Sequence, residues 1–197
     1  RQEGQTAAGG NDRVNKKKRR SGVFMGALEK KVAEELETAF KTEIAGHIFY
    51  TAAAAFITDG KGKNIFTHLA KEELEHIKVI SIIAEYVKKG HGWPTYKDAL
   101  KSGESAVKGG LPIFPGSDEL VKKLQKNQTE QNAIKIGIES EEAAVELYSG
   151  MLKVAKTPAE KVTLTKLLEM EKGHLKILRW ESESLLKTGF WCGEMEY

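Results

Sequence analysis

The chain has 197 residues, of which 40% are hydrophobic and 30% charged, and it contains one cysteine, Cys192. This length is enough for a single domain with a substantial apolar core. One cysteine excludes a disulfide within the chain and a cysteine-rich electron-transfer centre, and no apolar run approaches the roughly 20 residues that cross a bilayer.

The formal net charge of +3 is concentrated at the start of the chain. Residues 1–24 contain seven basic and two acidic residues, a local charge of +5, so the rest of the chain carries −2. We expect this glycine-rich, basic segment to be a disordered tail. The near-neutral remainder argues against nucleic-acid binding, and the start lacks the apolar segment of a secretory signal, which favours a cytoplasmic location.

Four long helices are predicted within one domain that spans residues 25–190, followed by a tail over 191–197. Apolar periodicity and turn signals place these helices at residues 25–58, 62–90, 118–156 and 158–187. The connection over 91–117 contains three of the four prolines and is long enough to cross the bundle. A short helix over 96–101 is expected within it. We expect the aromatic end of the chain to pack back onto the bundle or onto a partner.

Several residues mark the predicted helix ends. Ser117 is a candidate N-cap for the third long helix, and Gly90 ends the second. The fourth helix has the sharpest start, because Thr157 can cap it, Pro158 suits its first position and Glu160 can complete a capping box.

The most informative feature is an internal repeat with an offset of 98 residues. A Glu followed seven residues later by Tyr, and then a Glu-x-x-His motif, occur twice without a gap. The first copy comprises Glu43, Tyr50, Glu73 and His76, and the second comprises Glu141, Tyr148, Glu171 and His174. Polar residues are kept better than apolar ones, which a purely structural repeat does not explain.

This pattern predicts a site for two metal ions. Residues three apart share one face of a helix, so each Glu-x-x-His motif can direct a carboxylate and an imidazole to one point. Each remaining helix adds one carboxylate. Four glutamates balance two divalent cations, whereas the same carboxylates without metal would repel one another in a bundle core. This ligand arrangement is the one known for di-iron and di-manganese four-helix bundles.

The tyrosines fit the same site. Tyr50 and Tyr148 lie two turns after Glu43 and Glu141, and helical side chains lean back toward the N-terminus. We therefore expect each hydroxyl to approach the carboxylates and to orient a ligand without binding metal itself.

On these motifs, the sequence resembles the rubrerythrin-like branch of the ferritin-like di-iron proteins over about residues 36–90 and 134–190. The resemblance implies an all-α, ferritin-like antiparallel four-helix bundle with one long crossover between the second and third helices. It also implies two iron ions, with manganese as the alternative. Glu73 and Glu171 would bridge the ions, Glu43 and Glu141 would be terminal ligands, and His76 and His174 would each bind one ion.

The function implied by the resemblance is that of an oxidoreductase that reduces hydrogen peroxide or dioxygen. Electrons would come from an external donor, and the chain would form a homodimer or a larger homo-oligomer. Rubrerythrins carry a second carboxylate one turn along the third helix, where this chain has Ala144, and they carry Cys-x-x-Cys pairs, which it lacks. Ferroxidase or iron-storage activity in an oligomeric shell is therefore the alternative.

Other polar residues admit simpler interpretations. His47 lies one turn from Glu43, but its repeat partner is Val145, so a core or cavity-lining histidine is favoured over a seventh ligand. His68 is expected at the surface. The same expectation, of solvated helix flanks, applies to Glu72, Glu75, Glu139, Glu142 and Glu146. A metal-free interaction bundle with a basic arm is the third hypothesis for the whole chain.

Overall fold

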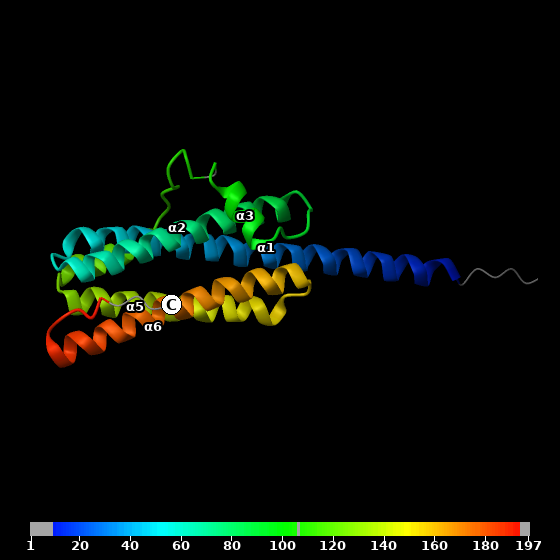
Figure 1. The fold of residues 1–197 in the computed structure, drawn as a ribbon. Coiled ribbons are helices and arrows are strands. Elements are labelled where there is room, and N and C mark those ends of the chain that lie inside the picture. Colours follow the sequence, from blue (N-terminus) through cyan, green and yellow to red (C-terminus); the bar gives the residue numbers. More distant parts are fainter. Residues whose placement is uncertain (1–9, 106, 194–197) are drawn as a thin grey trace, which may run out of the picture.

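The computed structural model describes residues 10–105 and 107–193, with side chains described from residue 30 onward. Over these residues all regular secondary structure is helical, and loops join the helices (Figure 1). Its helices are α1 (Gly10–Phe56), α2 (Gly60–Lys88), α3 (Tyr96–Gly103), α4 (Glu119–Lys126), α5 (Glu130–Val154) and α6 (Pro158–Thr188). The prediction of an all-α helical bundle is confirmed at this level.

The four long helices form two hairpins that lie against each other. Helix α1 packs along α2, and α5 packs along α6, while α1 also contacts α5 (Figure 1). Over residues 89–129, the chain returns to the end of the bundle at which α2 began, so α2 and α5 run in the same direction. The short helix α3 packs on α2 within this crossover. Of the helices in the described part of the chain, none combines the length and apolar character of a membrane span.

Helix α1 begins earlier than the sequence predicted. Residues 1–9 of the predicted tail lie outside the described residues, whereas residues 10–24 belong to α1. Lysine and arginine are good helix formers, and no proline occurs between residues 10 and 56, so the helix can extend through the basic segment.

The single helix predicted over 118–156 is wrong, because the chain breaks it into α4 and α5. Asn127 leaves the helical region, with φ −150° and ψ 89°. Thr129 then caps α5 by accepting a hydrogen bond from the Asn132 backbone N–H at 3.1 Å, and the Asn132 side chain donates to the Asn127 carbonyl at 2.7 Å. These short polar side chains stabilise the break as a new helix start.

Other helix ends are close to the predicted ones. The capping box of Thr157 and Glu160 is present, with Pro158 at the first position of α6. Gly90 has φ +73°, as the residue after a helix often does. The predicted cap Ser117 is wrong by one residue, because Asp118 occupies the N-cap of α4 and Ser117 is buried.

The end of the chain packs on the bundle up to the last described residue, Gly193. The Trp191 indole is buried against Phe66, with ring centroids 6.1 Å apart, and its Nε1–H donates to Glu130 at 3.0 Å. The buried Glu181 carboxylate accepts hydrogen bonds from the backbone N–H groups of Cys192 and Gly193, both at 2.8 Å. The predicted aromatic packing is therefore confirmed for Trp191, and residues 194–197 lie outside the described residues.

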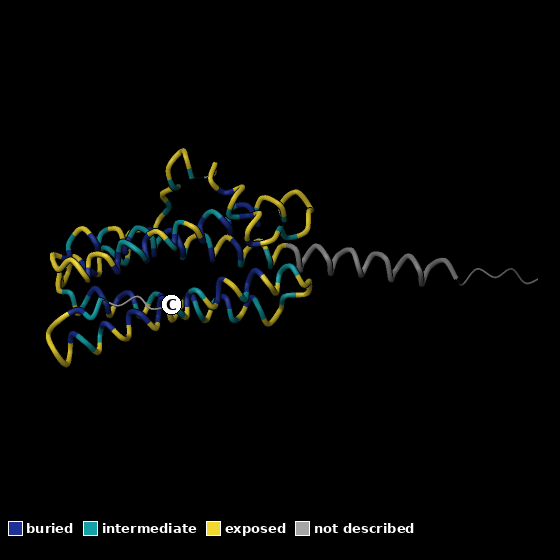
Figure 2. The backbone as a smooth tube through the Cα atoms, viewed as in Figure 1, coloured by how far each residue is buried: buried dark blue, intermediate teal, exposed yellow. Residues whose placement is uncertain are grey.

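Buried residues recur along each long helix (Figure 2). The apolar ones form two clusters, one around Phe49, Phe66 and Leu178 and the other around Leu36, Ile80 and Leu167. On α1, α2, α5 and α6 alike, buried glutamates and histidines stand in sequence between the residues of the two clusters. The bundle thus encloses a polar layer between two apolar ones.

Candidate metal centre

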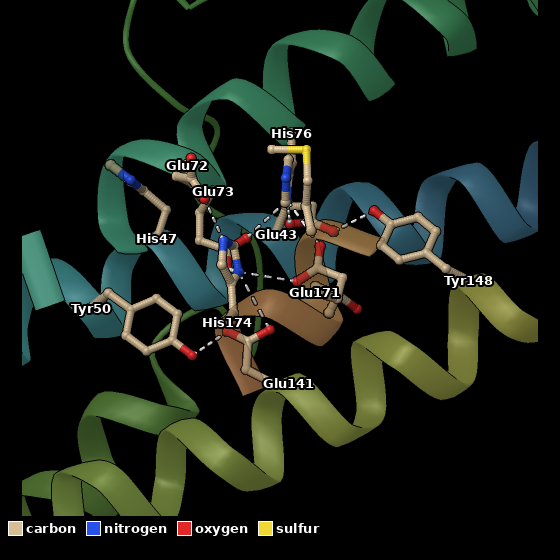
Figure 3. A network of polar contacts seen from close by, with 12 residues as sticks. Glu43, His47, Tyr50, Glu72, Glu73, His76, Glu141, Tyr148, Glu171 and His174 are labelled. Atoms are coloured by element: carbon tan, nitrogen blue, oxygen red, sulfur yellow. Dashed lines mark hydrogen bonds and ion pairs between the residues drawn. The ribbon is translucent and has the colours of Figure 1, made fainter. Parts of the chain in front are cut away.

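The six residues predicted as metal ligands come together in this polar layer (Figure 3). All of them are almost fully buried, with exposures of 0–3%. They are Glu43 on α1, Glu73 and His76 on α2, Glu141 on α5, and Glu171 and His174 on α6. Each of the four long helices therefore contributes at least one ligand candidate, and the two hairpins meet at this point.

The candidates form two overlapping sets of four. One set comprises Glu43, Glu73, His76 and Glu171, and the other comprises Glu73, Glu141, Glu171 and His174. Within each set, one possible ligand atom per residue lies within 4.8 Å of all the others. Because Glu73 and Glu171 belong to both sets, their carboxylates lie between two adjacent positions that can each hold a cation.

The imidazoles direct the same nitrogen toward the carboxylates. His76 Nδ1 lies 2.9 Å from Glu171 Oε1 and 3.1 Å from Glu43 Oε2. His174 Nδ1 lies 3.3 Å from Glu171 Oε2 and 3.6 Å from Glu141 Oε2. The two rings stack with centroids 5.6 Å apart and planes 21° apart, so the histidines occupy corresponding places in the two sets.

Burial and neighbouring charges strongly shift the pKa values of the carboxylates in this layer. Burial raises the pKa of Glu73 well above its ordinary value, and Glu43 and Glu171 raise it further. Burial and the neighbouring Glu171 raise the pKa of Glu141 to about 7. The pKa of Glu171 shifts in the other direction, because the effect of His76 and His174 outweighs that of burial and lowers it. Protonation of Glu73 and Glu141 is therefore favoured here and offsets part of the buried negative charge, a role that divalent cations can take over.

The pKa values of the two imidazoles are raised in turn by these carboxylates. Burial alone would lower the pKa of His76, but the carboxylates of Glu171 and Glu43 raise it well above its ordinary value. The pKa of His174 is also raised, because the effect of Glu141 and Glu171 outweighs that of burial. Without a cation, the site thus holds its positive charge on these rings.

Unsatisfied atoms indicate that protons alone do not complete the site. Both carboxylate oxygens of Glu171, and Nδ1 of His174, are buried and make no well-aligned hydrogen bond among the described residues, although their polar neighbours lie close. Buried polar atoms are normally paired, and each such exception calls for an explanation. Ligation of cations would satisfy these atoms, and carboxylate oxygen with imidazole nitrogen is a donor set that suits iron and manganese. The residues present therefore fit two such ions.

Both tyrosines point into the layer, and each contacts the other half of the repeat. The Tyr50 hydroxyl donates a hydrogen bond to Glu141, and the Tyr148 hydroxyl donates one to Glu43. Burial, reinforced by the carboxylate that each one contacts, raises the pKa of both tyrosines well above the ordinary value. The hydroxyls therefore stay protonated and hold the two carboxylates in place.

A glycine of α1 stands beside the shared carboxylate of Glu73. A Cβ added at Gly46 would lie 3.3 Å from Cδ of Glu73, which is tight for a side-chain contact. The repeat partner of Gly46 is Ala144, a buried residue of α5. Glycine at position 46 thus allows Glu73 to lie close to the α1 backbone.

One residue of the site was not predicted. Glu72, expected in a solvated flank, is half-buried, and its Oε2 lies 2.8 Å from Nε2 of His174. His68, expected at the surface, is also half-buried, with Nε2 3.7 Å from the same oxygen. The sequence held no signal for Glu72, because its repeat partner is Met170 and it stands in a glutamate-rich run with Glu73 and Glu75.

His47 lies where the simpler of its two interpretations, a core or cavity-lining histidine, places it. Its Nδ1 donates to the Ala70 carbonyl at 2.7 Å, and the residue lines a surface cavity of about 240 Å³ between α1 and α2. It belongs to neither ligand set. Of the other glutamates, Glu142 is exposed and pairs with Arg179 at 2.6 Å, as expected for a solvated flank.

Comparisons with protein-family models, with curated proteins and with solved structures find no match to this chain. Its chemistry is therefore inferred from its own residues.

Proposed function

We propose that this chain is a non-haem di-iron protein, similar to rubrerythrins, that reduces hydrogen peroxide or dioxygen within a ferritin-like bundle. The observation that carries the proposal is the pair of ligand sets that share Glu73 and Glu171. Two sets with shared carboxylates are what a bridged pair of ions requires, whereas a single structural ion needs only one set. The up-and-down hairpins joined by a long crossover agree with the one-crossover bundles of this class.

Iron is proposed over other metals because of the donor atoms. Four carboxylates and two imidazoles form the site, and no thiolate is near it, since Cys192 contacts the bundle through its backbone. Hard oxygen donors with imidazole favour iron or manganese over copper or zinc. Manganese with the same ligands remains the second choice of metal.

The residues around the ions would have distinct roles. Glu73 and Glu171 would bridge, Glu43 and Glu141 would be terminal ligands, and His76 and His174 would each bind one ion. Tyr50 and Tyr148 would orient the terminal carboxylates through their hydroxyl groups. The apolar clusters on both sides would exclude bulk water from the layer.

When bound, a ferrous pair supplies two electrons, which with two protons reduce one hydrogen peroxide to two waters. The electrons must then be returned by an external donor, because this chain has one cysteine and cannot build a four-cysteine redox centre. Its own side chains hold and orient the ions and do not need to be oxidised.

Ferroxidase activity is the second candidate, and Ala144 favours it. The position one turn after Glu141 holds no carboxylate, and its repeat partner Gly46 has none either. The site thus has six ligand candidates and not the larger set implied by rubrerythrins. In this alternative, iron would be the substrate and would leave the site after oxidation.

Rapid mixing of the anaerobic ferrous protein with each oxidant tests the proposal. We expect oxidation by hydrogen peroxide to be faster than by dioxygen, and to stop after two irons per chain. Protein loaded with zinc, which is not redox-active, is the control and should react with neither. Faster reaction with dioxygen and continued oxidation of added iron would establish the ferroxidase instead. No reaction with either oxidant would refute both functions.

A further inference from the structure

The two histidines of the site differ at the nitrogen that faces away from the carboxylates. Nε2 of His174 lies 2.8 Å from Glu72 Oε2, within hydrogen-bond distance. Nε2 of His76 is buried and has no hydrogen-bond partner among the described residues. The inner nitrogens of both rings face the same shared carboxylates, so the difference is confined to the outer side.

The two halves of the sequence repeat differ at the position that causes this difference. The offset of 98 residues that pairs the six ligand candidates maps Glu72 onto Met170. Met170 is a weak acceptor, and its sulfur receives the hydroxyl of Tyr96 at 3.6 Å. The second half of the repeat therefore supplies no carboxylate corresponding to Glu72.

A carboxylate on the outer nitrogen of a ligating imidazole has a known effect. It fixes the tautomer that carries the proton on Nε2, leaves the Nδ1 lone pair free for a cation, and increases the basicity of that nitrogen. Glu72 can do this for His174, and it is anchored on α2 directly before Glu73. Among the described residues, His76 has no such partner at Nε2, so its tautomer is less constrained.

We infer that the two metal positions are inequivalent, and that Glu72 makes the position formed by Glu73, Glu141, Glu171 and His174 the first to fill. Glu72 belongs to neither ligand set, so it acts as a positioning residue through His174. The inference rests on the proposed function only in requiring that the site binds two cations, and it is independent of the oxidant.

Titration of the metal-free full chain with Co²⁺ in a calorimeter tests this directly. Two binding steps of different affinity are expected. Glu72→Met, which copies the residue of the other half, should weaken the first step by about 10–100-fold, the usual effect of losing such a partner. Glu72→Gln should weaken it less, because the amide oxygen still accepts the hydrogen bond.

The matched control is Glu75→Gln on the same helix. Glu75 is exposed and belongs to neither ligand set, so both steps should keep their affinities. Circular dichroism of every variant without metal should match the wild type, since Glu72 contributes only local polar contacts to a bundle held by its apolar layers.

Variants of the two histidines assign the effect to one position. In a His76→Ala background, the position at His174 remains, and Glu72→Met should still weaken cobalt binding. In a His174→Ala background, the partner of Glu72 is gone, and the same substitution should have no further effect. A merely structural role of Glu72 would weaken binding in both backgrounds.

Three outcomes overturn the inference. Two wild-type steps of equal affinity would show that the positions are equivalent, while leaving the two-metal proposal intact. An undiminished effect of Glu72→Met in the His174→Ala background would show that Glu72 does not act through His174. If no Co²⁺ bound at the site at all, both the inference and the proposed function would be refuted.

Discussion

Tyr50 and Tyr148 link the two halves of the bundle through the carboxylates that they contact. Each tyrosine and the glutamate seven residues before it lie on one helix, yet each hydroxyl donates to the glutamate of the opposite hairpin. The sequence predicted that the hydroxyls return to the carboxylate layer. It did not predict the exchange of partners, because a repeat identifies equivalent residues but not which copy each one contacts.

Glu141 and Glu142 provide the sharpest test at the scale of single residues. Glu141 is buried in the site and accepts the Tyr50 hydroxyl, whereas Glu142 is exposed and pairs with Arg179. We expect Glu141→Gln to reduce the bound metal from two ions to at most one per chain, because a neutral amide is a poor ligand for a hard cation. Elemental analysis of the purified variant measures this.

Glu142→Gln is the matched control for that substitution. It removes an exposed ion pair, which contributes only about 0–1 kcal/mol to folding, and it should leave two ions bound. Equal metal loss in both variants, or loss in Glu142→Gln alone, would contradict the placement of Glu141 in the site.

At the scale of elements, periodicity predicted the helices better than their interruptions. The residues from Gln125 to Asn132 are all polar and carry no apolar periodicity, so the break among them depends on the local hydrogen bonds of Thr129 and Asn132. The start of α6 was predictable because Thr157, Pro158 and Glu160 form a local motif. The docking of Trp191 depends on residues far away in sequence, and only its aromatic character was visible beforehand.

The C-terminal segment requires a glycine on α2. A Cβ added at Gly62 would lie 2.4 Å from the Trp191 indole, a distance that real side chains do not tolerate. We expect Gly62→Ala to displace Trp191 and to destabilise the fold by about 1–2 kcal/mol, although alanine favours helix more than glycine. Chemical unfolding followed by circular dichroism measures the loss, and tryptophan fluorescence reports the displacement.

Gly60 is the control for this effect, because it lies on the same helix and a Cβ there would meet nothing within 4 Å. Gly60→Ala should leave the free energy of unfolding unchanged or slightly increased. Similar stability changes in the two variants would mean that Trp191 does not dock over Gly62.

At the scale of the whole molecule, the site depends on how the two hairpins meet. The ligand candidates come from all four of α1, α2, α5 and α6, and the shared residues Glu73 and Glu171 come from different hairpins. The repeat made the six residues predictable, because the same ligand residue types occur twice at one offset. Glu72 was not predictable, because it breaks the repeat.

The most direct test of the central claim is the position of metal in crystals of the iron-reconstituted protein, located by anomalous diffraction. The account predicts two peaks about 3.5–4 Å apart, the usual spacing of a two-metal site, with Glu73 and Glu171 contacting both. A single peak, two peaks without a shared carboxylate, or iron only at the surface would contradict it.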